Sequence, residues 1–208
     1  MTPNHDELPL GRLEALSDAV FAIAMTLLVL EIIVPTGAGD HLLPSILHLW
    51  PSYLAYITSF STIGGVWLLH SNITRALRAA DSTLYRLNLL VLLLASFLPF
   101  PTRLVAEYFG ERGPERVAAV FYGLVLLALA LATTAFARYA FEHSGLLKDG
   151  VDAETAAAPL SSEPSLVMYG AGIGVSFLVP TVGVAVYLAS AIYRALPART
   201  LHRVLWRR

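Results

Sequence analysis

Four polar side chains interrupt the most apolar stretches of this chain, and their types allow several kinds of chemistry. Asp18 lies at the start of the first apolar run, Trp67 and His70 lie near the end of the second, and Asn88 lies near the start of the third. A carboxylate, an imidazole and an amide could bind a cation, transfer a proton or hydrogen-bond to one another. Because an unpaired polar group in an apolar medium costs on the order of several kcal/mol, we expect these side chains to lie together.

If the three runs are consecutive antiparallel helices, the four side chains arrive at one depth. Trp67 and His70 are three residues apart and share a helix face. Mutual hydrogen bonding that fixes the helices is favoured over catalysis, and a metal site would need more histidine or carboxylate ligands. The side chains of Ser17 and Asp18 point in different directions around the helix, so the carboxylate of Asp18 cannot activate the Ser17 hydroxyl as a nucleophile. We predict no enzyme activity, no metal site and no cofactor.

The composition indicates an integral membrane protein. Of the 208 residues 56% are hydrophobic and 14% are charged, and the mean hydropathy is +0.65. Soluble proteins average about 25% charged residues. The net charge is −1, there is no long basic patch for nucleic acid, and there is no cysteine for disulfides or thiolate metal sites. The N-terminus lacks the basic lead-in of a cleavable signal peptide, so we expect the first apolar run to stay in the mature protein.

Six apolar spans are expected to form one all-α transmembrane domain over residues 1–208. Pro99 and Pro101 should end or kink the third span, and Pro180 should divide the last apolar segment into two short spans. A polar stretch, residues 138–163, should be a cytoplasmic loop. The expected spans are residues 12–34, 47–73, 84–104, 117–136, 165–179 and 181–196.

The arginines and lysines of the connections place both termini in the cytoplasm, in a multi-pass protein of the cell membrane. The connection after the second span carries Arg75, Arg78 and Arg86, whereas the turn after the first span carries none. The C-terminal tail adds further arginines. The connection over residues 103–116 carries three arginines that count against this orientation.

The first span has an aliphatic stripe along one side. A helix over residues 12–34 would be about 34 Å long, enough to cross a hydrocarbon core of about 30 Å. At about 100° per residue, six apolar side chains share one face with Thr26 at its edge, while Ser17 and Asp18 point away. On periodicity alone, ordinary helix packing is the more economical explanation. The six side chains are Leu16, Ala19, Ile23, Leu27, Leu30 and Val34.

The same residues carry a family resemblance. The pattern Arg-x-x-x-Leu-Ser-Asp from Arg12 to Asp18, followed by AVFAIAMTLLVLEI, resembles the Arg-x-x-x-Phe-Ser-Asp signature of the transmembrane protein 175 potassium channel family, in its prokaryotic six-helix branch. The stretches GVWLLHSN and LNLLVLLLASFLPFPT are similar to that family's second and third helices. Two positions depart from the pattern. Leu16 replaces the aromatic residue, and Ser71 stands where a second histidine often follows His70.

The resemblance implies a homotetramer with the first helix of each subunit lining a central pore, without the TVGYG filter of ordinary potassium channels. Ile23 would form the narrowest hydrophobic ring, with Leu27 and Leu30 as further rings, and Thr26 would supply a ring of hydroxyls for ion selectivity. Glu31 could concentrate cations at the pore mouth, or it could simply lie at headgroup level. The residues implied for a polar network that holds the pore helix are Arg12, Ser17, Asp18, Trp67 and His70, which Asn88 joins by its depth.

The expected function is passive conduction of K⁺ with modest discrimination against Na⁺. Its partners would be further copies of the chain, the lipid bilayer, and K⁺ and other monovalent cations. A hydrophobic ring closes a pore by dewetting and opens it on small dilation. The alternative is a proton-coupled secondary cation transporter that uses Asp18 and His70, although the inverted repeats typical of that class are not evident in the sequence.

Overall fold

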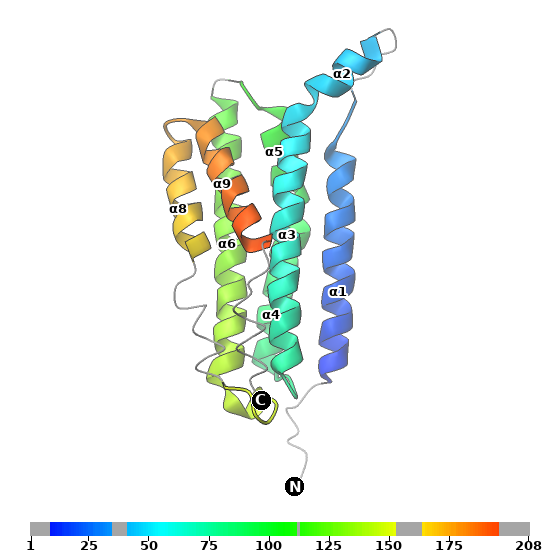
Figure 1. The fold of residues 1–208 in the computed structure, drawn as a ribbon, viewed down its shortest axis with the longest axis vertical. Coiled ribbons are helices and arrows are strands. Elements are labelled where there is room, and N and C mark those ends of the chain that lie inside the picture. The colour runs from blue at the N-terminus through cyan, green and yellow to red at the C-terminus, as the bar shows by residue number, and fades with distance from the viewer. Residues whose placement is uncertain (1–8, 35–40, 112, 153–163, 196–208) are drawn as a thin grey trace.

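The computed structural model describes residues 9–34, 41–111, 113–152 and 164–195, which form a bundle of helices (Figure 1). Within these ranges the regular elements are helical, with one antiparallel bridge between Leu77 and Leu147. The all-α class predicted from the sequence is confirmed. Three helical stretches are long and apolar enough to cross a membrane, namely Leu10–Glu31, Ser82–Glu107 and Pro114–Glu142.

The first helix, α1 (Leu10–Leu27), ends earlier than the sequence predicts. It tightens into a short 3-10 helix, η1 (Leu28–Glu31), and Ile32 then adopts an extended conformation. The helix expected over residues 12–34 is therefore shorter in the structure. β-branched residues follow α1, and a proline follows Val34 and disfavours helical dihedrals at that residue. Together α1 and η1 are about 35 Å long at their usual rises per residue. This length still matches a hydrocarbon core of about 30 Å.

A short helix, α2 (Leu42–His48), leads into the long helix α3 (Trp50–Ala76). Figure 1 shows α2 projecting beyond the end of the bundle, whereas α3 runs through it beside α1. α3 contacts α1, α5, α6 and α9, so other helices pack against several of its sides. Its buried side carries polar groups, of which the threonines bond to carbonyls of α3 itself while Ser59 and His70 bond to other helices. The polar residues are Thr58, Ser59, Thr62, His70 and Thr74.

Proline divides the third apolar segment into two helices. Asp81 caps the start of α4 (Ser82–Phe97), because its Oδ1 accepts a hydrogen bond of 2.8 Å from a backbone N–H of the first turn. After one residue the chain continues as α5 (Pro99–Glu107). The rings of Pro99 and Pro101 lack the N–H groups that an uninterrupted helix needs, and both prolines are buried. The break lies where the sequence predicts it and forms an elbow packed against the bundle.

The longest helix, α6 (Pro114–Glu142), extends into the segment expected to be a loop, residues 138–163. The expectation is wrong for residues 138–142, which continue the helix. Their apolar side chains give the helix a face to bury, since Ala140 and Phe141 both pack into the core. Alanine is also the strongest helix former.

The chain after α6 is held against the end of α3 rather than free in solvent. A 3-10 turn, η3 (Ser144–Leu146), is followed by Lys148, whose Nζ donates a hydrogen bond of 2.8 Å to the carbonyl of Arg75. The backbone N–H of Lys148 donates to the carbonyl of Ala76 at 2.9 Å. The rest of the expected loop, residues 153–163, lies outside the described residues.

Two shorter helices, α8 (Pro164–Ser176) and α9 (Pro180–Ala195), form a hairpin beside α6 (Figure 1). The interruption before Pro180 has the same cause as the elbow between α4 and α5. At about 1.5 Å per residue these helices are about 20 and 24 Å long, less than a hydrocarbon core of about 30 Å. The six-span arrangement therefore stays a prediction. The predicted cytoplasmic termini lie outside the described residues.

A buried tyrosine locks this hairpin onto α6. The hydroxyl of Tyr187 donates to the carbonyl of Ala119 at 3.2 Å and lies 3.2 Å from Ser176 Oγ. The ring passes so close to Gly123 of α6 and Gly172 of α8 that a Cβ atom at either position would collide with it. These two glycines therefore create the space that the tyrosine fills.

We expect Gly123→Ala to lower the stability of the protein, because the new methyl group displaces the ring of Tyr187. Overpacking of this kind costs about 1–3 kcal/mol. The measurement is thermal unfolding of the purified protein in detergent, followed by circular dichroism. Gly174→Ala is the matched control, since nothing lies within 4 Å of its Cβ position and alanine favours a helix. Equal unfolding temperatures for the two variants would contradict this account.

Candidate functional site

Helix α1 together with η1 has a buried face and an outward face. The buried face contacts α3 and α4. On the outward face the side chains of Ile23 and Leu30 are 57% and 67% exposed. The residues of the buried face follow one another at intervals of three or four positions, as expected for one side of a helix. They are Leu13, Ser17, Phe21, Ala24 and Leu28.

The aliphatic stripe predicted from the sequence faces away from the subunit. Only 28% of the apolar span in α1 is buried, against 44% and 56% for the other two long apolar spans. α1 therefore lies at the edge of the subunit with its stripe open to lipid or to another copy of the chain. Packing within the subunit, the more economical explanation on periodicity alone, does not account for the stripe. Its exposed residues are Leu16, Ala19, Ile23, Thr26, Leu27, Leu30 and Val34.

Thr26 places an oxygen atom on this otherwise apolar surface. Its hydroxyl donates a hydrogen bond of 2.8 Å to the carbonyl of Ile23 on the same helix. The proton is thereby directed toward the backbone, and the two lone pairs of the exposed oxygen can accept a hydrogen bond or ligate a cation. Thr26 can therefore offer weak oxygen ligation to a cation without leaving a donor unsatisfied.

A buried relay of hydrogen bonds ties α1 to α4 and α3. His70 Nε2 donates to Asn88 Oδ1 at 2.7 Å, and Asn88 Nδ2 donates to Ser17 Oγ at 3.0 Å. Ser17 Oγ in turn donates to the carbonyl of Leu13 at 2.7 Å. The three side chains are almost completely buried. The structure therefore brings together three of the residues that the sequence assigned to a polar network.

Aromatic rings enclose the imidazole of this relay. The ring of Phe136 from α6 stacks on His70 with centroids 4.9 Å apart, and Phe21 from α1 meets it edge-on at 5.5 Å. Aromatic rings from two helices thus cover the imidazole of the relay. Sequence reasoning did not identify Phe136, because an aromatic residue within an apolar helix carries no signal of which neighbour it will meet.

Asp18 and Trp67 form a separate contact nearer the surface. Trp67 Nε1 donates to Asp18 Oδ1 at 2.8 Å, and Asp18 is exposed rather than buried in the network. Among the described residues, Arg12 makes no side-chain hydrogen bond or ion pair with this contact or with the relay. The single network expected from the sequence is therefore two contacts at one depth, without Arg12.

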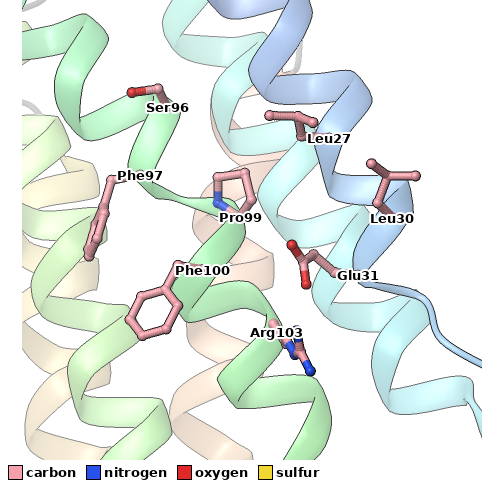
Figure 2. Close-up of a pocket in the computed structure, with 8 residues that line it drawn as sticks. All are labelled: Leu27, Leu30, Glu31, Ser96, Phe97, Pro99, Phe100 and Arg103. Atoms are coloured by element: carbon pink, nitrogen blue, oxygen red, sulfur yellow. The ribbon is translucent and has the colours of Figure 1, made fainter.

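A surface pocket lies beside η1, at the elbow between α4 and α5 (Figure 2). Glu31, the predicted pore-mouth carboxylate, lines it together with Arg103 of α5, one of the three arginines in the connection over residues 103–116. Arg103 Nε lies 3.4 Å from Glu107 Oε2, one turn along the same helix. The lining residues are Leu27, Leu30, Glu31, Ser96, Phe97, Pro99, Phe100 and Arg103.

The described part of the chain contains no group of three or more histidine, cysteine or acidic residues placed to hold a metal ion. The polar residues instead form hydrogen bonds between helices. Together with the apolar spans, these features define an α-helical integral membrane protein whose N-terminal helix is pinned on one face and open on the other.

The chain belongs to the family of the endosomal/lysosomal potassium channel TMEM175, whose sequence pattern matches residues 12–99. A potassium channel of Chamaesiphon minutus is 40% identical over 190 residues, which cover 89% of this chain and 93% of that protein. A potassium channel of Streptomyces collinus is 44% identical over 149 residues, which cover 71% of this chain and 72% of that protein.

A solved structure has the same fold. The crystal structure of a lysosomal potassium-selective channel TMEM175 homolog from Chamaesiphon minutus matches with a TM-score of 0.80 and 37% sequence identity. The match covers 91% of this chain and 98% of that one. The family resemblance read from the first three apolar runs is confirmed, and the family is one of ion channels rather than enzymes. The roles of individual residues in a pore stay predictions.

We expect Asn88→Ala to destabilise the subunit, because it leaves His70 and Ser17 without their shared partner in a buried site. A buried group left unsatisfied costs about 1–3 kcal/mol. The measurement is the unfolding temperature of purified protein in detergent. Ser96→Ala on the same helix is the control, because its exposed hydroxyl bonds only to the carbonyl of Leu93. If the two variants unfold at the same temperature, the relay does not stabilise the bundle.

Proposed function

We propose that the chain is a potassium-permeable cation channel in the cell membrane, in which four copies surround a pore with their α1 helices. The observation that carries the proposal is the outward apolar stripe of α1, on a helix held to its own subunit by the opposite face. Membership of a family of potassium channels supports it. The permeant K⁺ ion is the substrate, and no cofactor is required.

Ile23 forms the constriction of the proposed pore. Four isoleucine side chains around an axis make a ring that empties of water when it is narrow and conducts after a small dilation. Leu27 and Leu30 lie one and two turns farther along the same exposed face and form further rings. Flux is therefore passive and gated by the width of the hydrophobic rings.

Selectivity in this pore is modest. The chain has no TVGYG sequence, so it lacks a filter of stacked backbone carbonyls. The oxygen of Thr26, one turn from Ile23, replaces part of the hydration shell of a cation. Glu31 at the end of η1 attracts cations toward the mouth. Both termini face the cytoplasm in this arrangement.

The first test is the reversal potential of purified protein in liposomes, with a K⁺ gradient opposed by a Na⁺ gradient. A potential that follows the K⁺ gradient supports a K⁺-permeable pore. Tetramers that carry no passive cation current would overturn the proposal, and a saturating flux coupled to protons in fixed stoichiometry would favour a secondary transporter. Cross-linking of the same liposomes establishes whether tetramers are present.

We expect Ile23→Asn to raise K⁺ flux and to move the reversal potential toward zero, because a polar ring holds water in the constriction and admits Na⁺. The same liposome assay measures both quantities. Leu131→Asn is the matched control, since Leu131 is 53% exposed on α6 and lies outside the proposed pore. Unchanged currents from correctly assembled Ile23→Asn protein would contradict the constriction.

A further inference from the structure

The pore-mouth carboxylate has a basic neighbour on another helix. Glu31 ends η1, and Arg103 lies on α5, which contacts η1. Figure 2 shows the two side chains near each other, Glu31 from η1 and Arg103 from α5, and Leu27 and Leu30 of the proposed pore face line the same pocket. A negative and a positive group thus share one site at the end of the first helix.

The charge of Arg103 is only weakly engaged by its other partner. Its contact with Glu107, at 3.4 Å, joins two side chains that are 51% and 52% exposed. Exposed pairs of this kind hold little interaction energy, because solvent screens them and both side chains move. The described residues show no direct ion pair between Arg103 and Glu31. The two charged groups therefore share the pocket without a direct bond between them.

The elbow between α4 and α5 is what brings this arginine to the pore helix. The chain is interrupted before Pro99, and Pro99 lines the pocket between the two helices. Arg103 follows one turn later on the redirected helix. The fold therefore sets the position of Arg103 against η1. Arg103 is also one of the three arginines that count against the predicted orientation, and this position gives it a local role.

We propose that Arg103 limits the supply of cations to the pore by opposing the charge of Glu31. The proposal rests on the proposed function, since it assigns the pair to the mouth of a conducting pore. A carboxylate near a pore entrance raises the local concentration of cations, and a nearby positive charge reduces it. The balance of the two charges, repeated in each subunit, sets the flux when few mobile ions screen them.

The ionic strength of the solution separates this effect from a structural one. The screening length is about 30 Å at 0.01 M salt and about 3 Å at 1 M salt. A charge at the mouth therefore changes cation flux in dilute solution and loses its effect in concentrated solution. A change in pore width or folding alters flux at both concentrations.

The experiment compares K⁺ flux through Arg103→Gln and wild-type protein in liposomes at 0.01 M and 1 M K⁺. At 0.01 M we expect Arg103→Gln to raise flux at least two-fold, because each charge lost at about 10 Å in water contributes about that factor, and at 1 M we expect no difference. Glu31→Gln should lower flux at 0.01 M, and the double variant should return close to the wild-type value. Arg103→Lys, which keeps the charge, should behave as wild type.

Arg116→Gln is the matched control, because Arg116 is exposed near the start of α6 and does not line the pocket. If Arg103→Gln and Arg116→Gln give the same flux at 0.01 M, the inference is wrong. It is also wrong if Arg103→Gln changes flux equally at both salt concentrations. Failure of the proposed function is a separate result, since the wild-type protein would then carry no K⁺ flux at either concentration.

Discussion

The hydrogen-bonded relay from His70 through Asn88 to Ser17 is the constraint on which the placement of α1 depends. It crosses from α3 to α4 to α1 in a buried region. Water is absent from the hydrocarbon core and cannot replace a broken bond there, so rotating α1 away from the relay would leave polar groups unpaired. Since successive helical residues turn by about 100°, fixing Ser17 inward also fixes Ile23 outward.

The remainder of the subunit forms the body against which α1 is held. Apolar packing and small residues hold this part together, as in the fit of Tyr187 against Gly123 and Gly172. Proline interruptions end individual helices, and α5, which begins after the interruption at Leu98, contacts η1 at the end of α1. Packing thus forms the body of the bundle, while a few polar hydrogen bonds and prolines set the position of α1 against it.

The sequence predicted those features that depend on local chemistry or on depth in the membrane. The helical class, the break at Pro99 and the meeting of Ser17, His70 and Asn88 follow from propensity and the cost of unpaired polar groups. Features that depend on three-dimensional neighbours were missed. The stacking of Phe136 on His70 is one example, because helical periodicity gives a direction for each side chain but not the residue it meets.

The dependence on three-dimensional neighbours also explains why one chain cannot display the proposed pore. The relay determines which face of α1 is turned away from the subunit, but an axis lined by that face exists only when several copies assemble. Contacts within one subunit leave Ile23 and Leu30 open, so their burial in the proposed channel depends entirely on neighbours. In that assembly the width at Ile23 follows the rotation of α1, and the buried hydrogen bonds that resist this rotation therefore also resist changes in the width of the pore.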